Sequence, residues 1–340
     1  MRFIGSKTNL LPELESFIGS HAPSNGTFCD IFSGTGAVAR HFKSKYRIIS
    51  NDVMRFSHVL QSASIELGTI PTFDRLSGTG IEDPIDYLNT AEIYHHRSPF
   101  ITNNYAPSEG CDRRYLSTDN ARRIDFIRQQ LDIWREQDLV SYLEFNYLLA
   151  CLIEAVPYVS NIAGTYGAYL KHWDNRALKR IELKNFTIEQ NVGANESFNE
   201  KSEFLIERIE GDILYLDPPY NSRQYLPNYH LLETIACYDY PEISGKTGMR
   251  TYTEQKSKFC SKRSVASAFE EIITKAKFQH IFISYSSEGL MSREDLLELL
   301  QRYSTDGKVG IKEIPYRRYK HTKTDKPSNL FEYIFHMRKL

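Results

Sequence analysis

Four consecutive residues, Asp217-Pro218-Pro219-Tyr220, follow an apolar run and could do chemistry. Residues 213–216 read as a buried strand, which the two prolines would end in a stiff corner. A plain turn would account for the acid and the prolines, because Asp and Pro both favour turns. It would leave Tyr220 unexplained. A rigid corner that holds a carboxylate, a backbone carbonyl and an aromatic ring is typical of a site.

An exocyclic aromatic amine is a group that such a corner could hold. The amine is a poor nucleophile because its lone pair is delocalised into the ring. The Asp217 carboxylate and the Pro218 carbonyl can each accept one of its N–H bonds, which draws the nitrogen toward tetrahedral geometry and exposes the lone pair. Tyr220 can stack on the base, which is worth about 1–3 kcal/mol. A base held in this way has left its duplex, so the motif predicts a clamp for a flipped base.

A glycine-rich turn, Ser33-Gly34-Thr35-Gly36, follows another apolar run and marks a candidate cofactor loop. It lacks the third glycine of a dinucleotide fingerprint, and no Gly-Lys-Ser/Thr follows, which disfavours a P-loop and weakens an NAD interpretation. Asp52 ends the next apolar run, and an acid there can hold both ribose hydroxyls. Asp52 could also cap the following helix, and the two roles are compatible.

Strands and helices alternate around these motifs. The βαβα order of residues 27–67 predicts an α/β fold with a doubly wound, mostly parallel sheet, in which ligands sit at the carboxyl ends of the strands. We expect the sheet to resume with a strand in "LKNFTIEQ" and a helix in "NEKSEFLIERI". After the corner motif we expect helices and strands in "NYHLLETIACY", "VASAFEEIITKAK", "HIFISYS", "VGIKEIPYRRY" and "LFEYIFHMRK".

The pattern changes at about Gly68, where a breaker-rich and then polar and aromatic stretch begins. Helical spacing returns at 117–134, with Ser117 as a candidate N-cap, and at 141–156. We therefore predict a catalytic domain made of residues 1–67 and 181–340, and an inserted, mainly helical subdomain of residues 68–180.

Composition is ordinary for a globular protein, with 41% hydrophobic and 25% charged residues. No run approaches the roughly 20 apolar residues of a membrane span, and no secretory segment is visible at the N-terminus. The five cysteines are far apart and form no Cys-x-x-Cys, so we expect reduced, partly buried thiols and no metal site. A cytoplasmic, monomeric protein is expected.

Charge is distributed unevenly, although the net charge is only −1. From Lys246 to the last residue there are 19 Lys and Arg against 11 Asp and Glu. Two basic runs stand out, "GKTGMRTYTEQKSKFCSKR" and "PYRRYKHTKTDK". Such runs are as often solvated faces as nucleic-acid contacts.

Several motifs together resemble the α-group, or Dam-like D12, adenine-N6 DNA methyltransferases. "RFIGSK", "DIFSGTG", Asp52 and "DPPY" resemble the family's N-terminal, cofactor-loop, ribose-binding and catalytic motifs, in the order of the α group. "MRFIGSK", "LIEAVP", "GTYGAYLKHWD", "NYHLLETIA" and "YDYPEI" are similar to the methylase halves of Fok-type type IIS restriction–modification systems.

The resemblance implies site residues. The catalytic motif would be Asp217, Pro218, Pro219 and Tyr220, with Asp217 placed where methyl donor and target amine meet. S-adenosyl-L-methionine, which becomes S-adenosyl-L-homocysteine, would contact Phe3, Lys7, Asp30, Phe32, Ser33, Gly34, Gly36, Asp52 and Asp217. The family often has an acid near the end of the third strand, where this chain reads "TIEQNVGAN" and Asn191 is the best match.

The same resemblance implies double-stranded DNA as a partner. We expect the insertion to read bases through Arg113, Arg114, Lys171 and Arg176. The basic loop would hold phosphates through Lys246, Arg250, Lys256, Lys258, Lys262 and Arg263. The Fok-type likeness further implies a short asymmetric target such as GGATG, methylated on one strand, together with a cognate restriction endonuclease and a second methylase.

Three alternatives remain at this point. Cytosine-N4 methyltransferases share the geometry but usually carry Ser at the position of Asp217. Protein glutamine methyltransferases favour Asn there and lack the insertion. A DNA-binding relative without activity would not need Asp217, Tyr220 and the glycine loop to be intact.

Overall fold

The structure, a computed structural model, describes residue 5 and residues 7–186, 188–316 and 330–339. The described chain forms two compact units. The helical unit comprises Met54–Gln190 and Tyr225–Glu254. The sheet unit comprises the described parts of Gly5–Val53, Asn191–Gln224 and Gln255–Leu340.

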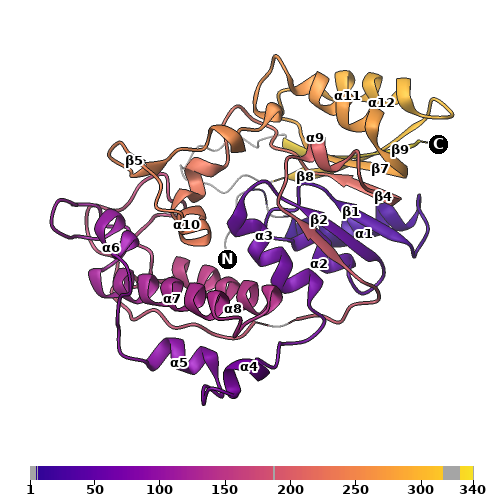
Figure 1. The fold of residues 1–340 in the computed structure, drawn as a ribbon. Coiled ribbons are helices and arrows are strands. Elements are labelled where there is room, and N and C mark those ends of the chain that lie inside the picture. The colour runs from indigo at the N-terminus through magenta and orange to yellow at the C-terminus, as the bar shows by residue number, and fades with distance from the viewer. Residues whose placement is uncertain (1–4, 6, 187, 317–329, 340) are drawn as a thin grey trace. The chain divides into compact units, whose positions relative to one another are not determined.

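A seven-stranded sheet organises the sheet unit (Figure 1). Its strands, in chain order, are β1 (Thr27–Asp30), β2 (Arg47–Asn51), β3 (Glu196–Phe198), β4 (Glu210–Leu216), β7 (Lys277–Ser286), β8 (Val309–Tyr316) and β9 (Leu330–Arg338). The spatial order is β3-β2-β1-β4-β7-β9-β8. The first five strands run parallel, and β9 is antiparallel to both neighbours. The predicted doubly wound, mostly parallel α/β sheet is confirmed.

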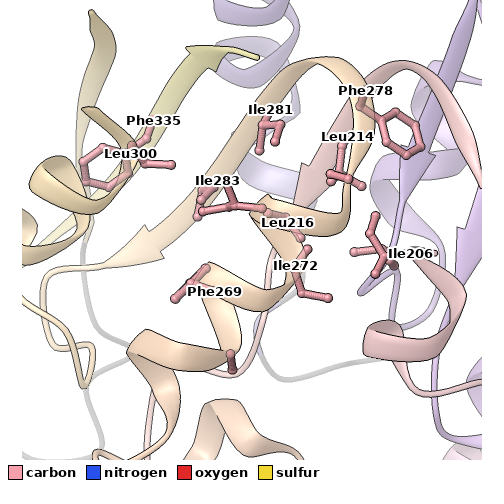
Figure 2. Packing of buried hydrophobic residues seen from close by; sticks show 14 of the residues in the cluster. Ile206, Leu214, Leu216, Phe269, Ile272, Phe278, Ile281, Ile283, Leu300 and Phe335 are labelled. Carbon is pink, nitrogen blue, oxygen red and sulfur yellow. The ribbon is translucent and has the colours of Figure 1, made fainter. Parts of the chain in front are cut away.

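Alternating side chains cover the two faces of this sheet, as a strand's period of two requires. On one face Leu214 and Ile281 belong to a cluster that includes Ile272 of α11, shown in Figure 2. On the other face Phe28 stacks on Phe42 of α2, with ring centroids 4.7 Å apart. The helical segments of the unit are η1 (Thr8–Leu10), α1 (Leu11–Gly19), α2 (Ala37–Phe42), α9 (Ser202–Leu205), η5 (Lys258–Cys260), α11 (Val265–Lys275) and α12 (Arg293–Tyr303).

The second unit is built mainly from helices. These are α3 (Arg55–Gln61), continued by a π-helical turn at Ser62–Glu66, then α4 (Asp74–Ser77), α5 (Pro84–Thr90), α6 (Phe100–Tyr105), α7 (Thr118–Glu136), α8 (Tyr142–Ala155), a 3-10 turn at Val156–Val159, and α10 (Leu226–Cys237). A two-strand hairpin of β5 (Ile243–Ser244) and β6 (Met249–Arg250) completes it, and a 3-10 turn at Thr253–Gln255 follows. No described helix is long and apolar enough to cross a membrane.

Ser117 caps α7 as predicted, because its hydroxyl accepts a hydrogen bond from the Asn120 amide. The predicted strand at "LKNFTIEQ" is wrong. Its described residues form no strand, because the backbone there bonds to side chains instead: the Leu183 amide donates to Asn89 Oδ1 at 2.8 Å. The third parallel strand is the short β3 further on. The helix expected in "NEKSEFLIERI" contracts to the four residues of α9.

Candidate active site

The corner motif begins directly after β4, which lies between β1 and β7. Parallel strands bring their carboxyl ends to one edge of the sheet, and Asp30, the last residue of β1, is in register with Tyr215. Tyr215 is fully buried and donates to Ser284 of β7 at 2.8 Å. The Asp30 and Asp217 carboxylates are therefore positioned by neighbouring strands of one rigid sheet.

A buried ion cluster surrounds the Asp217 carboxylate. Lys7 Nζ donates to Asp217 Oδ1 at 2.7 Å and lies 3.1 Å from Glu332 Oε1 of β9. Burial alone would lower the pKa of Lys7, but Asp217 and Glu332 together raise it well above its ordinary value. Burial raises the pKa of Asp217 to about 6, with Lys7 acting against the rise and Glu332 adding to it. Asp217 is thus an ionised acceptor at neutral pH.

Tyr220, the last residue of the corner motif, is held in place by the core of the sheet unit. Tyr220 is half-buried and packs against the hydrophobic cluster of the sheet unit. Its carbonyl accepts from the Leu290 amide at 2.9 Å. An aromatic ring held on a packed core keeps its orientation at low entropic cost, which suits a stacking surface.

The glycine-rich turn joins β1 to α2 and has the backbone that its glycines permit. Gly34 and Gly36 have φ values of 53° and 79°, in the left-handed region that favours glycine. The Gly34 amide donates to Asp52 Oδ2 at 3.0 Å. Phe32 lies edge-on to Phe259, with ring centroids 5.1 Å apart. Asp52 therefore contacts the glycine-rich turn, which the sequence also assigns to the candidate cofactor site.

The expected helix cap at Asp52 is not formed. Helix α3 starts three residues later, at Arg55, with Met54 at the N-cap position and no side-chain cap bond from it. Instead, the carboxylate of Glu233 in α10 accepts from the Arg55 and Phe56 amides at 2.8 and 2.9 Å. A buried acid from a distant segment takes the place of a local cap.

Asp30 has an unused acceptor. Its Oδ2 accepts from the Ser33 hydroxyl at 2.9 Å, whereas its buried Oδ1 has no hydrogen-bond partner among the residues that the structure describes. Burial raises the pKa of Asp30 to about 7, the Ser33 bond opposes the rise, and Asp217 adds to it. Buried polar atoms are normally paired, so the Asp30 carboxylate can accept a further hydrogen bond at Oδ1.

Two of the arginines predicted to contact DNA, Arg113 and Arg250, are not exposed and bond to the protein itself. Arg113 donates through its three guanidinium nitrogens to the carbonyls of Lys246, Asn104 and Gly245. Arg250 is buried and makes a two-bond ion pair with Asp239, at 3.1 and 2.7 Å. Both side chains therefore support the β5–β6 hairpin.

The other predicted DNA contacts lie on exposed segments. Arg114 donates to the Lys171 carbonyl and Arg176 to the Ser160 and Ile162 carbonyls, while both residues remain exposed. Lys258 forms ion pairs with Glu203 and Glu271. The remaining ones, also exposed, are Lys171, Lys246, Lys256, Lys262 and Arg263.

The remaining sequence predictions concern residues that are not described or that lie outside the candidate active site. Phe3 and most of the run "PYRRYKHTKTDK" lie outside the described residues. Asn191 follows no strand, since β3 begins at Glu196. All five cysteines are free thiols. Within the described ranges no group of three or more His, Cys, Asp or Glu side chains could hold a metal ion.

Sequence reasoning missed Glu332. A signal for it exists, because Glu332 is an acid within the apolar strand β9, where Ile334, Phe335 and Met337 are all buried. A charged residue on the buried side of a strand normally has a partner.

Comparison with known proteins gives consistent matches. The family model described as D12 class N6 adenine-specific DNA methyltransferase matches residues 3–299. Over its whole length the chain is 50% identical to the type II methyltransferase M.FokI of Planomicrobium okeanokoites, of which it covers 53%. It is 41% identical to the modification methylase StsI of Streptococcus sanguinis, of which it covers 52%.

The chain thus spans about half the length of these two relatives. A third relative, the type II methyltransferase M.NlaIII of Neisseria lactamica, is 38% identical, and the match covers 98% of each chain. With a family match over most of its residues and a similar relative matched nearly end to end, the chain belongs to the D12 class N6 adenine-specific DNA methyltransferase family.

Proposed function

We propose that this protein transfers a methyl group from S-adenosyl-L-methionine to adenine N6 in a short duplex DNA sequence, as the modification half of a restriction–modification system. The observation that carries the proposal is the Asp217 carboxylate at the end of β4, ion-paired to Lys7 beside an aromatic corner. The names of the type II relatives support the restriction–modification role.

The described residues fit the cofactor. S-adenosyl-L-methionine is a cation with an α-ammonium donor and ribose hydroxyls, and it would supply the electrophilic methyl group. The buried Oδ1 of Asp30, which no described residue bonds, is an acceptor for such a donor. Asp52 would hold the ribose hydroxyls, and the turn at Gly34 and Gly36 leaves room for a close approach because neither residue has a side chain. Asp30 lies within electrostatic reach of Asp217 and Asp52, and these three acids suit a positively charged ligand.

The chain's own part in the reaction is to hold the amine. Among the described residues Lys7 is the hydrogen-bond partner of Asp217, at Oδ1. Oδ2 can then accept one N–H of a flipped adenine while the Pro218 carbonyl accepts the other. Tyr220 would stack on the base. The amine becomes more nucleophilic as it pyramidalises, and after the methyl group is transferred its extra proton passes to the Asp217 carboxylate or to solvent.

Single-molecule sequencing of DNA methylated by this chain alone tests the proposal. We expect adenine marks in one short motif. One active site acting on an asymmetric sequence presents the same adenine each time, so we also expect marks on one strand only, with a second methylase needed for the other. Cytosine marks would refute the adenine assignment, and marks on both strands of each site would refute the one-strand proposal.

The activity should depend on pH through Asp217. Its protonation below a pKa of about 6 removes the charged acceptor for the amine. We expect kcat/KM to fall tenfold per pH unit below that value, because the active fraction is set by one ionisation. Rates of methylation at saturating cofactor, measured from pH 5 to 8, would check this. A flat profile down to pH 5 would contradict it.

Replacing Asp52 by Ala should weaken cofactor binding. Loss of charge-assisted hydrogen bonds costs about 1.5–3 kcal/mol, or roughly 10- to 150-fold in Kd. Calorimetry with S-adenosyl-L-homocysteine measures it. Asp52→Asn is the matched control, since it keeps an acceptor for the Gly34 amide but loses the charge. Unchanged affinity in Asp52→Ala would leave Asp52 with a loop-supporting role only.

Phosphate contacts can be separated from paired lysines on the same segment. Lys262 and Arg263 are exposed and take part in no ion pair within the described residues, whereas Lys258 pairs with two glutamates. We expect Lys262→Gln/Arg263→Gln to reduce the slope of log K against log salt by about 2, without changing the methylated motif. Lys258→Gln should change this slope less. A changed motif in the double variant would assign these residues to base readout.

A further inference from the structure

We propose that Glu332 is a positioning residue for methyl transfer, acting through Lys7 on the catalytic carboxylate Asp217. The inference rests on the proposed function and adds a residue from the last strand of the sheet to it. Lys7 lies between the two acids, 2.7 Å from Asp217 Oδ1 and 3.1 Å from Glu332 Oε1. The side chains of Lys7 and Glu332 are only 7% and 9% exposed.

A buried ammonium needs compensating acceptors, and their arrangement fixes where it sits. With Asp217 alone, Lys7 could follow either carboxylate oxygen. Glu332 attracts it as an ion-pair partner from a second direction, on a strand that pairs with both β7 and β8. Glu332 is in register with Ser286 and Ile314, within the paired part of β9. The ammonium is therefore kept on Oδ1, and Oδ2 stays available for the amine.

The charged groups around Asp217 allow the role of Glu332 to be measured. The charged and titratable groups around Asp217 are Lys7 from the N-terminal segment, Glu332 from β9, Tyr215 from β4 and Asp30 from β1. Lys7 lowers the pKa of Asp217, and Glu332 raises it. Removing the charge of Glu332 should therefore make Asp217 easier to ionise, even as it loosens Lys7.

The experiment compares Glu332→Gln with the wild type on duplex DNA. We expect kcat to fall roughly 10- to 100-fold, the scale of a misplaced reacting group, and the acid limb of the pH–rate profile to move to lower pH. Affinity for S-adenosyl-L-homocysteine should stay within about twofold. Glu313→Gln is the control, because it removes an acid on the adjacent strand β8 that pairs with Arg293 at the surface. It should leave both kcat and the profile unchanged.

A second comparison decides whether Glu332 acts through Lys7. If it does, Lys7→Met/Glu332→Gln should be no slower than Lys7→Met alone, because the partner is already missing. A wild-type kcat in Glu332→Gln, a lowered kcat with an unmoved acid limb, or additive losses in the double variant would each overturn the inference. If Glu332→Gln does not fold, Glu332→Asp provides the test instead. It keeps the charge on a shorter side chain, and it must still lower kcat. A wild-type chain that marks no adenine would refute the proposed function instead.

Discussion

Asp217→Ala should reduce methylation by about 10³-fold while DNA binding stays measurable. In the proposed function the side chain is the charged acceptor for the target amine, and removing one preorganised hydrogen-bonding group from a transition state costs about 10²–10³ in kcat. The loss should be at the upper end of that range because the variant also leaves Lys7 with Glu332 as its remaining acid partner. Single-turnover kinetics with saturating cofactor would measure it.

Asp217→Asn provides the matched variant. It keeps the shape and one oxygen acceptor but carries no charge, so we expect a rate between those of Ala and wild type. Fluorescence anisotropy with the duplex and calorimetry with S-adenosyl-L-homocysteine would establish that both ligands still bind. A near-normal rate in Asp217→Ala, with binding intact, would show that the clamp is assigned to the wrong group.

Glu233→Ala should be among the most destabilising single changes in the helical unit. Glu233 is fully buried, and its two carboxylate oxygens accept the first two amides of α3. Without it these N–H groups are left without an acceptor, one of them in the protein interior. Hydrogen bonds to charged groups contribute about 1.5–3 kcal/mol each, so a loss of about 3–5 kcal/mol in the free energy of unfolding is expected.

Thermal unfolding followed by circular dichroism would measure this loss, which should lower the midpoint by several degrees or more. Glu242→Ala is a suitable control, since Glu242 is an exposed acid of the same unit. Surface changes of that kind usually stay within about 0.5 kcal/mol. Equal midpoints for the two variants would show that α3 does not depend on the distant carboxylate.

Elements whose conformation depends on neighbouring residues were predictable from the sequence, whereas those that depend on distant residues were not. The strand before Asp217, the glycine turn and the Ser117 cap were predictable because each depends on neighbouring residues. The strand expected at 183–190 was wrong, because alternating apolar residues were taken to pair with a sheet. In the structure the backbone there bonds to Asn89 and the side chain of Asn185 to Tyr147.

Some residues of the candidate site were likewise predictable from the sequence, and others were not. Asp217 was predictable because it ends an apolar run, and Asp30 because "DIFSGTG" resembles the family's cofactor loop. The ion cluster was not, because Lys7 and Glu332 lie near opposite ends of the chain and no spacing rule connects them. The roles of Arg113 and Arg250 in supporting a hairpin were equally invisible, since exposed and buried arginines look alike in a sequence.

The separation between Lys7 and Asp217, 210 positions, has a consequence for how the site comes into being. Contacts between residues so far apart form late, because closing a long loop costs entropy before the contact stabilises anything. A growing chain on the ribosome would carry the complete corner motif well before β9 emerges. The buried ammonium would then have one acid partner instead of two. Competence for the reaction should therefore coincide with the docking of the last strand, rather than with synthesis of the motif itself.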